Sequence, residues 1–137
     1  MIKYVIDACA LLAFLHDESG AEQVEKLLKE AETHKIKIYL HSITLYEVYY
    51  GVYRESGQLL ADNAMRAIVG LPIEVVEEFG REYFELSAYF KTNYRMSMAD
   101  SVMLGVAMDK SAVVVSADHH EFDPIDLDGD MKFLWIR

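Results

Sequence analysis

Apolar residues in this chain gather in five short runs, separated by longer segments in which apolar and polar positions alternate with helical spacing. The runs are rich in Val, Ile, Tyr and Phe and nearly continuous, as is typical of strands covered on both faces. Helical segments between successive strands favour crossover connections and a parallel sheet. The pattern predicts a three-layer α/β fold with about five strands, at residues 2–6, 36–40, 73–76, 112–116 and 133–136.

Capping signals predict where three of the helices begin. A Ser or Thr followed three residues later by an acid is typical of a helix start, because each side chain can bond a free backbone N–H of the first turn. Three pairs have this spacing: Ser19 with Glu22, Thr44 with Glu47, and Ser97 with Asp100. The first predicts a helix through about Glu32. The third predicts the last helix, which carries Met103, Leu104 and Ala107 towards the core.

Glycine, proline and apolar spacing predict two further helices. Gly57 and Gly70 bracket one, and Pro72 prevents its continuation. The other is predicted over residues 77–93, because apolar side chains recur at steps of four and three residues along one face. Those side chains are Phe79, Tyr83, Leu86 and Phe90.

Four acids are predicted to meet at one edge of the sheet. Asp7 closes the first apolar run, and Asp118 follows the fourth run within two residues. Glu47 and Asp100 are expected in the first turns of their helices. The carboxyl ends of parallel strands and the helix starts that follow them share the edge where ligands bind. We therefore expect these four carboxylates to form a site.

Each acid also has a purely structural interpretation. Asp7 could cap a helix starting at Ala8, Glu47 and Asp100 suit capping boxes, and Asp118 could be a turn residue. Together, however, carboxylates about 5 Å apart would repel by roughly 3 kcal/mol per ionised pair at an effective dielectric near 20. Such a group needs protons, a positively charged side chain or a cation. Oxygen ligands suit Mg²⁺ or Mn²⁺, ions that activate water and stabilise charge on a phosphodiester.

Composition points to one domain spanning residues 1–137 in a reducing compartment. The 137 residues are 53% hydrophobic, with two prolines and no low-complexity stretch. No apolar run is long enough for a membrane span, and the first residues do not resemble a signal peptide. Cys9 is the only cysteine, which excludes an internal disulfide and predicts a cytoplasmic location.

The net charge of −10 argues against simple electrostatic binding of nucleic acid. It leaves nucleic-acid chemistry open, because metal ions can neutralise a local acidic site. A basic protein partner is the other natural complement of such a surface.

Other motifs indicate less. His119 and His120 adjoin the predicted site, but adjacent residues do not share a face for zinc, so we expect a solvated loop there. The acidic residues 126–130 lack the EF-hand pattern, and no phosphate-cradling glycine motif, nucleophile elbow or dinucleotide fingerprint is present. One side of the second predicted helix carries four tyrosines, which favour core packing or a subunit contact over base stacking. They are Tyr46, Tyr49, Tyr50 and Tyr53.

In order and spacing, four segments along essentially the whole chain resemble the PIN domain family, and within it the small VapC-type toxins. The segments are Val5-Ile6-Asp7-Ala8-Cys9-Ala10-Leu11-Leu12, Glu47-Val48-Tyr49-Tyr50-Gly51, Ser97-Met98-Ala99-Asp100-Ser101, and Ser116-Ala117-Asp118 with Phe122. The resemblance implies a PIN-like fold and an endoribonuclease that acts as the toxin of a type II toxin–antitoxin system. It also implies a homodimer and neutralisation by a cognate antitoxin.

The same resemblance implies roles for individual residues. Asp7, Glu47, Asp100 and Asp118 would bind Mg²⁺ or Mn²⁺, and Ser116 would support the site through hydrogen bonds. Cys9 departs from the family, which usually has Ser or Thr two residues after the first Asp; a thiol is a weaker hydrogen-bond donor. Alternatives are a PIN nuclease in RNA maturation, a phosphoryl-transfer or receiver-type domain, and a non-catalytic acidic binding module.

Overall fold

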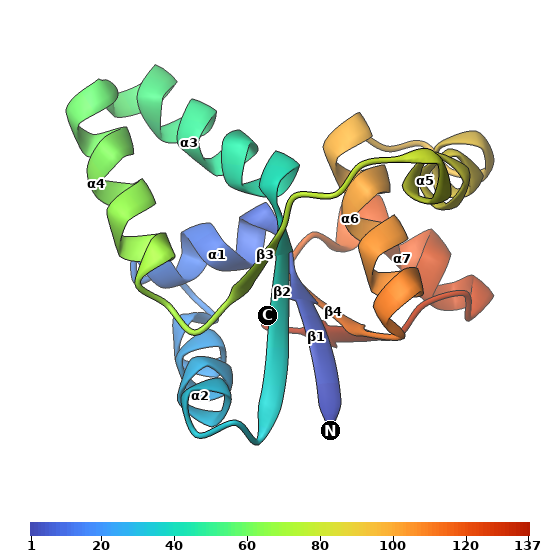
Figure 1. Ribbon diagram of the computed structural model, residues 1–137, viewed down its shortest axis with the longest axis horizontal. Coiled ribbons are helices and arrows are strands. Elements are labelled where there is room, and N and C mark those ends of the chain that lie inside the picture. Colours follow the sequence, from blue (N-terminus) through green and yellow to red (C-terminus); the bar gives the residue numbers. More distant parts are fainter.

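The computed structural model describes residues 1–137 and contains one five-stranded parallel sheet (Figure 1). The strand order is β3-β2-β1-β4-β5. The predicted strands are confirmed, each bound lying within one residue of the expected position. They are β1 (Ile2–Ile6), β2 (Ile36–His41), β3 (Glu74–Val76), β4 (Val113–Ser116) and β5 (Phe133–Trp135).

The first strand occupies the centre of the sheet. Val5 of β1 lies opposite Tyr39 of β2 on one side and Val114 of β4 on the other. The chain adds β2 and β3 on one side of β1, and then crosses over to add β4 and β5 on the other. The carboxyl ends of β1 and β4 therefore flank the topological switch point, where open α/β sheets bind ligands.

Seven helices cover the two faces of the sheet. In Figure 1, the helices of the first half of the chain lie on one side of the sheet and those of the second half on the other. The first group is α1 (Ala8–Leu15), α2 (Ala21–Glu32), α3 (Ser42–Ser56) and α4 (Gln58–Val69); the second is α5 (Arg81–Asn93), α6 (Met98–Lys110) and α7 (His119–Asp128). The predicted three-layer α/β architecture is confirmed.

Successive strand residues alternate between two hydrophobic cores. Val5 packs in the cluster that contains Phe90 of α5 and Leu104 of α6. Its neighbour Ile6 packs in the cluster that contains Leu11 of α1. Each of these side chains is at most 1% exposed. Burial on both faces explains why the strand sequences are almost continuously apolar.

Two helix starts differ from the predictions. The cap of α2 is Gly20, not Ser19, and Gly20 has the left-handed φ of 98°. A Cβ there would lie 2.8 Å from the Ile136 carbonyl oxygen, so glycine is required. Helix α3 begins at Ser42, capped by the His41 ring, rather than at Thr44. The Thr44 hydroxyl is instead buried without a hydrogen-bond partner, and Glu47 lies in the second turn.

Among the later helices, one predicted start is confirmed, one predicted start is moved, and one helix was not predicted. Ser97 caps α6 as expected, its Oγ accepting a 3.1 Å hydrogen bond from the Asp100 N–H. Helix α5 starts at Arg81, so Phe79 lies before it. Helix α7 was not predicted; it replaces the solvated loop expected at His119 and His120, despite the internal Pro124.

The tyrosine face of α3 is largely exposed rather than packed in the core. Tyr46, Tyr50 and Tyr53 are 63%, 48% and 47% exposed. Core packing was therefore the wrong interpretation for these three rings, and a subunit contact stays a prediction. Leu59 and Leu60 at the start of α4 are also exposed. No helix is long and apolar enough to cross a membrane.

Candidate active site

Asp7 lies at the centre of the site and is held on both carboxylate oxygens. It follows β1 and caps α1, with Oδ1 accepting a 2.8 Å hydrogen bond from the Ala10 N–H. Oδ2 accepts a 2.5 Å hydrogen bond from the Ser116 hydroxyl. Asp7 is only 3% exposed. The capping interpretation and the predicted site position are both satisfied by the same side chain.

Ser116 links the carboxyl ends of β1 and β4. Its hydroxyl donates to Asp7 and accepts a 2.9 Å hydrogen bond from the Asp118 N–H. The side chain is fully buried. Ser116 therefore fixes the orientation of Asp7 relative to the segment that carries Asp118.

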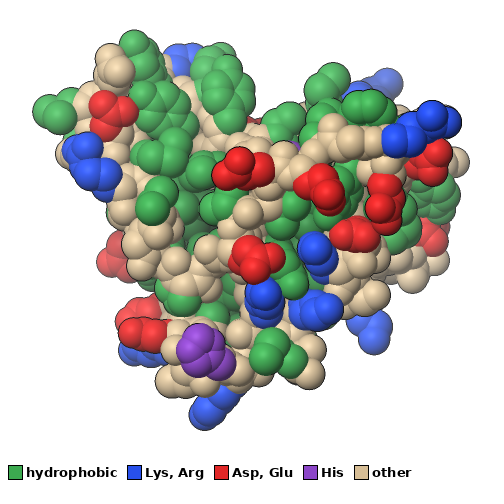
Figure 2. Space-filling view, in the orientation of Figure 1, with side chains coloured by type: hydrophobic (Ala, Val, Ile, Leu, Met, Phe, Trp, Pro, Cys, Tyr) green, Lys and Arg blue, Asp and Glu red, His purple; other side chains and the backbone are tan.

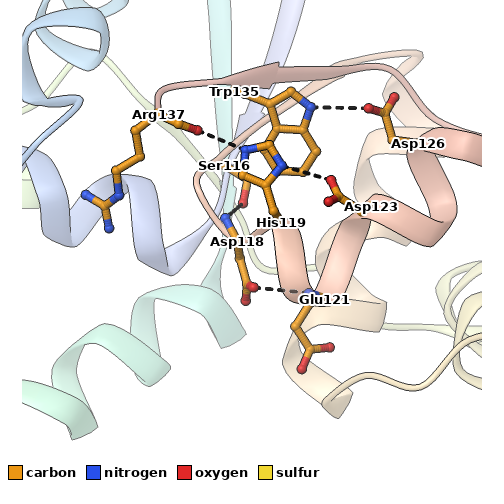
Figure 3. Close-up of polar contacts among 8 residues, drawn as sticks. All are labelled: Ser116, Asp118, His119, Glu121, Asp123, Asp126, Trp135 and Arg137. Atoms are coloured by element: carbon orange, nitrogen blue, oxygen red, sulfur yellow. Dashed lines mark hydrogen bonds and ion pairs between the residues drawn. The ribbon is translucent and has the colours of Figure 1, made fainter.

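Asp118 caps α7 rather than lying in a simple turn. Its Oδ1 accepts a 3.1 Å hydrogen bond from the Glu121 N–H, as Figure 3 shows. In that view the Asp118 and Glu121 side chains both point away from the aromatic pair formed by His119 and Trp135. Asp118 is thereby presented beside the switch point by the end of β4.

The remaining two predicted acids come from helices on opposite faces of the sheet. Glu47 extends from α3 and Asp100 from the first turn of α6. Both side chains are partly buried. Repulsion from Glu47 raises the pKa of Asp100, and repulsion from Asp118 and Glu47 raises the pKa of Asp7. The structure thus places the four acids in one electrostatic neighbourhood.

Burial is the largest cause of the raised pKa values of Asp7, Glu47 and Asp100. Loss of hydration raises the pKa of Asp7 from 3.8 to about 6, although the hydrogen bond from Ser116 acts in the opposite direction. Burial, followed by the charge of Glu47, raises the pKa of Asp100 to about 7. Burial also raises the pKa of Glu47. Displaced pKa values of this kind are common at functional sites.

Glu121 is a fifth carboxylate that the sequence analysis missed. Its Oε2 is buried and has no hydrogen-bond partner, and its charge contributes to the raised pKa of Asp100. Its position depends on α7, which was not predicted. The spacing Asp118-x-x-Glu121 is itself that of a helix start, and could have indicated both the helix and the extra acid.

The donor chemistry fits a hard divalent cation. None of the ion pairs in the structure involves Asp7, Glu47, Asp100, Asp118 or Glu121. A buried carboxylate oxygen without a partner calls for a proton, water or a cation. As the side chains stand, no group of three or more could hold a metal ion. The carboxylate donors fit a hard divalent cation in kind, and both the identity of the ion and the assignment of individual ligands stay predictions.

A second set of contacts borders the acids. The His119 ring stacks on Trp135 with the ring centroids 3.9 Å apart. Its Nδ1 bonds Asp123, and its Nε2 bonds the Arg137 carbonyl at 2.9 Å (Figure 3). The Arg137 guanidinium reaches back to Cys9. Burial raises the pKa of the Cys9 thiol, so the neutral thiol is favoured.

Solved structures with a similar fold include chains of VapBC complexes and a VapC toxin. Over all of both chains, the structure matches a chain of DNA-bound VapBC from Salmonella typhimurium with a TM-score of 0.75 and 15% identity. VapBC2 from Rickettsia felis, bound to a promoter DNA fragment, gives 0.74 at 15% identity, covering 97% of this chain and 98% of that one. Mycobacterium tuberculosis VapC20, described as a sarcin–ricin loop cleaving toxin, gives 0.66 at 14% identity over 88% and 94%.

Sequence comparison identifies the family. No curated protein matches the chain. The sequence model of the PIN domain, however, matches residues 4–126. This region contains β4, the second half of β1, the buried Asp7–Ser116 pair and all five acids described above. The chain therefore belongs to the PIN domain family.

Proposed function

We propose that this protein is a metal-dependent endoribonuclease built on a single PIN domain spanning residues 1–137. The observation that carries the proposal is the carboxylate cluster at the switch point, with Asp7 buried and the other acids partly buried, which has no cationic side chain as a partner. Mg²⁺ or Mn²⁺ would be held by Asp7, Glu47, Asp100 and Asp118. When bound, such an ion activates water and stabilises charge on a phosphodiester.

The residues of the chain have separate tasks in this proposal. Asp7 is the central ligand, because the Ala10 N–H and the Ser116 hydroxyl hold both of its oxygens in place. Ser116 is a positioning residue that links Asp7 to the Asp118 segment. Glu47, whose pKa is raised by burial, is suited to orient a water molecule and take its proton.

Cleavage of RNA is the direct test. The purified protein should cleave single-stranded RNA in Mg²⁺ or Mn²⁺, and EDTA should stop the reaction. A receiver-type domain or an acidic binding module would leave the RNA intact under both conditions. Cleavage that persists in EDTA would contradict the metal-dependent mechanism, provided that the Asp7→Asn protein, purified in parallel, is inactive.

We further propose that the protein is the toxin of a toxin–antitoxin pair. Its fold is that of chains solved in VapBC complexes, and its charge of −10 suits a basic partner. In this proposal an antitoxin segment lays Arg or Lys against the acids and displaces the metal. Arg is favoured, because its planar fork can bond a carboxylate through two N–H groups.

The apolar part of an antitoxin segment needs an apolar surface. Figure 2 shows hydrophobic side chains gathered over the α3–α4 arm. The exposed large apolar side chains of these two helices include Tyr46, Tyr50 and Tyr53 of α3 and Leu59 and Leu60 of α4. Exposed apolar side chains can mark a protein-interaction site, so the α3–α4 arm is our candidate for the partner segment.

Co-purification with the product of a neighbouring gene, followed by competition, tests the toxin proposal. The complex should bind Mn²⁺ weakly and cleave RNA slowly, and the free protein should do both well. Equal rates for complex and free protein would exclude occlusion of the site. Inducible expression without the partner, with mapping of new RNA ends, separates a toxin from a nuclease of RNA maturation, which would not arrest growth.

Two expectations complete the proposal. A homodimer is expected from the family resemblance, and light scattering of the purified protein measures it directly. The lone Cys9 fits the reducing cytoplasm, and fractionation of cells that express the tagged protein tests that location.

A further inference from the structure

We propose that the Arg137 guanidinium binds an RNA backbone phosphate next to the one that is cleaved. This proposal rests on the proposed ribonuclease function and adds to it a binding site for the substrate backbone. The chain has a net charge of −10, so its overall charge repels an RNA substrate, which is a polyanion. A cation at the border of the acidic site would supply local attraction where the overall charge supplies none.

The position of Arg137 follows from the sheet. Trp135 of β5 lies opposite Ser116 of β4, and the Ile136 N–H donates a 3.0 Å hydrogen bond to the Ser116 carbonyl. Residues 135–137 therefore run past the end of β4, where Ser116 and Asp118 form one side of the site. The His119 ring bonds the Arg137 carbonyl at 2.9 Å, which fixes the backbone there.

The side chain of Arg137 is held next to the start of α1. One terminal nitrogen, Nη1, donates a 2.6 Å hydrogen bond to the Ser19 carbonyl. The other, Nη2, lies 3.9 Å from the Cys9 Sγ and donates to it. Cys9 is two residues beyond Asp7 on α1. Figure 3 shows the guanidinium extending to the side opposite α7, so Arg137 and α7 border the acids from different directions.

The charge of Arg137 is not used inside the protein. Four other Lys and Arg side chains pair with carboxylates, whereas Arg137 takes part in none of the ion pairs. Its contacts are a carbonyl and a thiol, both formally neutral, and the residue is exposed. A guanidinium carries five N–H donors, so donors remain after these two bonds. A fixed, unpaired guanidinium with free donors is suited to a phosphate.

In this geometry Cys9 helps to hold the Arg137 side chain. Where the family resemblance leads us to expect Ser or Thr, the Cys9 sulfur accepts a bond from Arg137. Cys9→Ser keeps an acceptor at this place and should preserve RNA affinity. Cys9→Val removes the acceptor with little change in volume, and should weaken RNA binding less than loss of Arg137 itself.

The test is steady-state cleavage of a mixed-sequence single-stranded RNA oligonucleotide, labelled with a fluorophore and a quencher, at fixed low Mg²⁺ and varied KCl. Arg137→Gln should raise KM about fivefold to tenfold and leave kcat within about twofold. The slope of log KM against log salt should fall by about 0.7, the value for one lost phosphate contact on a single strand. Arg137→Lys should keep the slope, because it keeps the charge.

Lys132→Gln is the matched control. It removes the same charge from the residue before β5, at the opposite end of that strand, and should change neither KM nor the slope. A merely structural tether would lower the melting temperature of Arg137→Gln while leaving the salt slope as in the wild type, and would overturn the proposal. So would an unchanged KM in Arg137→Gln alongside active wild-type enzyme. Wild-type protein that cleaves no RNA in Mg²⁺ or Mn²⁺ would instead refute the proposed function, and this proposal with it.

Discussion

Asp7 and Ser116 are 109 residues apart in the chain and share one buried hydrogen bond. Both positions were predictable, Asp7 from the end of an apolar run and Ser116 from the family resemblance, and their roles stay predictions. Glu121 was not, because its place depends on a helix whose sequence is rich in Asp and His and contains Pro124. A residue is predictable here when its own element is predictable.

Asp7→Asn should abolish cleavage and increase the stability of the metal-free protein at neutral pH. The pKa of Asp7 is raised to about 6 in the folded protein, so the folded state binds this proton more tightly than the unfolded chain. The resulting stabilisation is present at about pH 4 and lost as the pH rises through about 6. Urea unfolding in EDTA should therefore show a gain for Asp7→Asn over the wild type at pH 8, on the order of 1–3 kcal/mol, and little difference at pH 4. An equal difference at both pH values would argue against the raised pKa.

Glu121→Gln tests the acid that only the structure identified. Removing its charge should lower the pKa of Asp100, since repulsion from Glu121 contributes to the raised value. We expect metal affinity to fall about tenfold, equivalent to about 1.4 kcal/mol, with the fold unchanged. Titration calorimetry with Mn²⁺ measures this. Glu55→Gln, an equal charge change at the exposed far end of α3, should leave the affinity unaltered.

Among the elements, the strands and the start of α6 followed from sequence, and the start of α3 did not. Apolar runs predict strands directly, and Ser97 is a typical cap. His41 is an unusual one: its Nδ1 accepts a 3.0 Å hydrogen bond from the Ile43 N–H, while Nε2 donates to the Glu78 carbonyl at 2.9 Å. A capping histidine has no sequence signature, and the sequence pattern therefore predicts a helix start at Thr44 instead. The two bonds also require the neutral ring, with its proton on Nε2.

His41→Leu and His41→Asn should separate the cap from simple burial. Asn can accept the bond from Ile43 but cannot reach Glu78, whereas Leu loses both bonds and leaves buried polar groups unpaired. We expect Leu to cost about 1–2 kcal/mol more than Asn in urea unfolding. If both variants lose the same stability, the cap on α3 contributes nothing, and the aromatic contacts of His41 with Phe79 and Tyr83 account for the loss.

At the scale of the whole molecule, the alternation of apolar runs with helical segments predicted the α/β class, the parallel sheet and the three layers. The exposure of the α3 tyrosines was not, since helical spacing places side chains on one face without saying what that face contacts. For the acids, too, the sequence predicted a location but not the neighbours: it placed them at one edge of the sheet. The strand order then showed that Asp7 and Asp118 flank the switch point.

Divalent metal should raise the melting temperature of the whole protein. A ligand that binds only the folded state stabilises it by about 2.7 kcal/mol at a hundredfold excess over Kd. The rise with Mg²⁺ or Mn²⁺ should shrink in Asp100→Asn. Calcium should also stabilise the protein yet support cleavage poorly, because it holds its ligands at longer and less regular distances. No shift at millimolar metal would leave the acids as caps and turns.

The pairing of β1 with β4 has a consequence for synthesis of the chain. The strand at the middle of the sheet is made first, but one of its two neighbours is made only after residue 113. Proteins emerge from the ribosome amino end first, so Asp7 lies without Ser116 and Asp118 until residue 118 has emerged. We expect ribosome-bound fragments that end before β4 to be inert towards RNA. A translating cell would then meet the proposed ribonuclease activity only after β4 and Asp118 have been made.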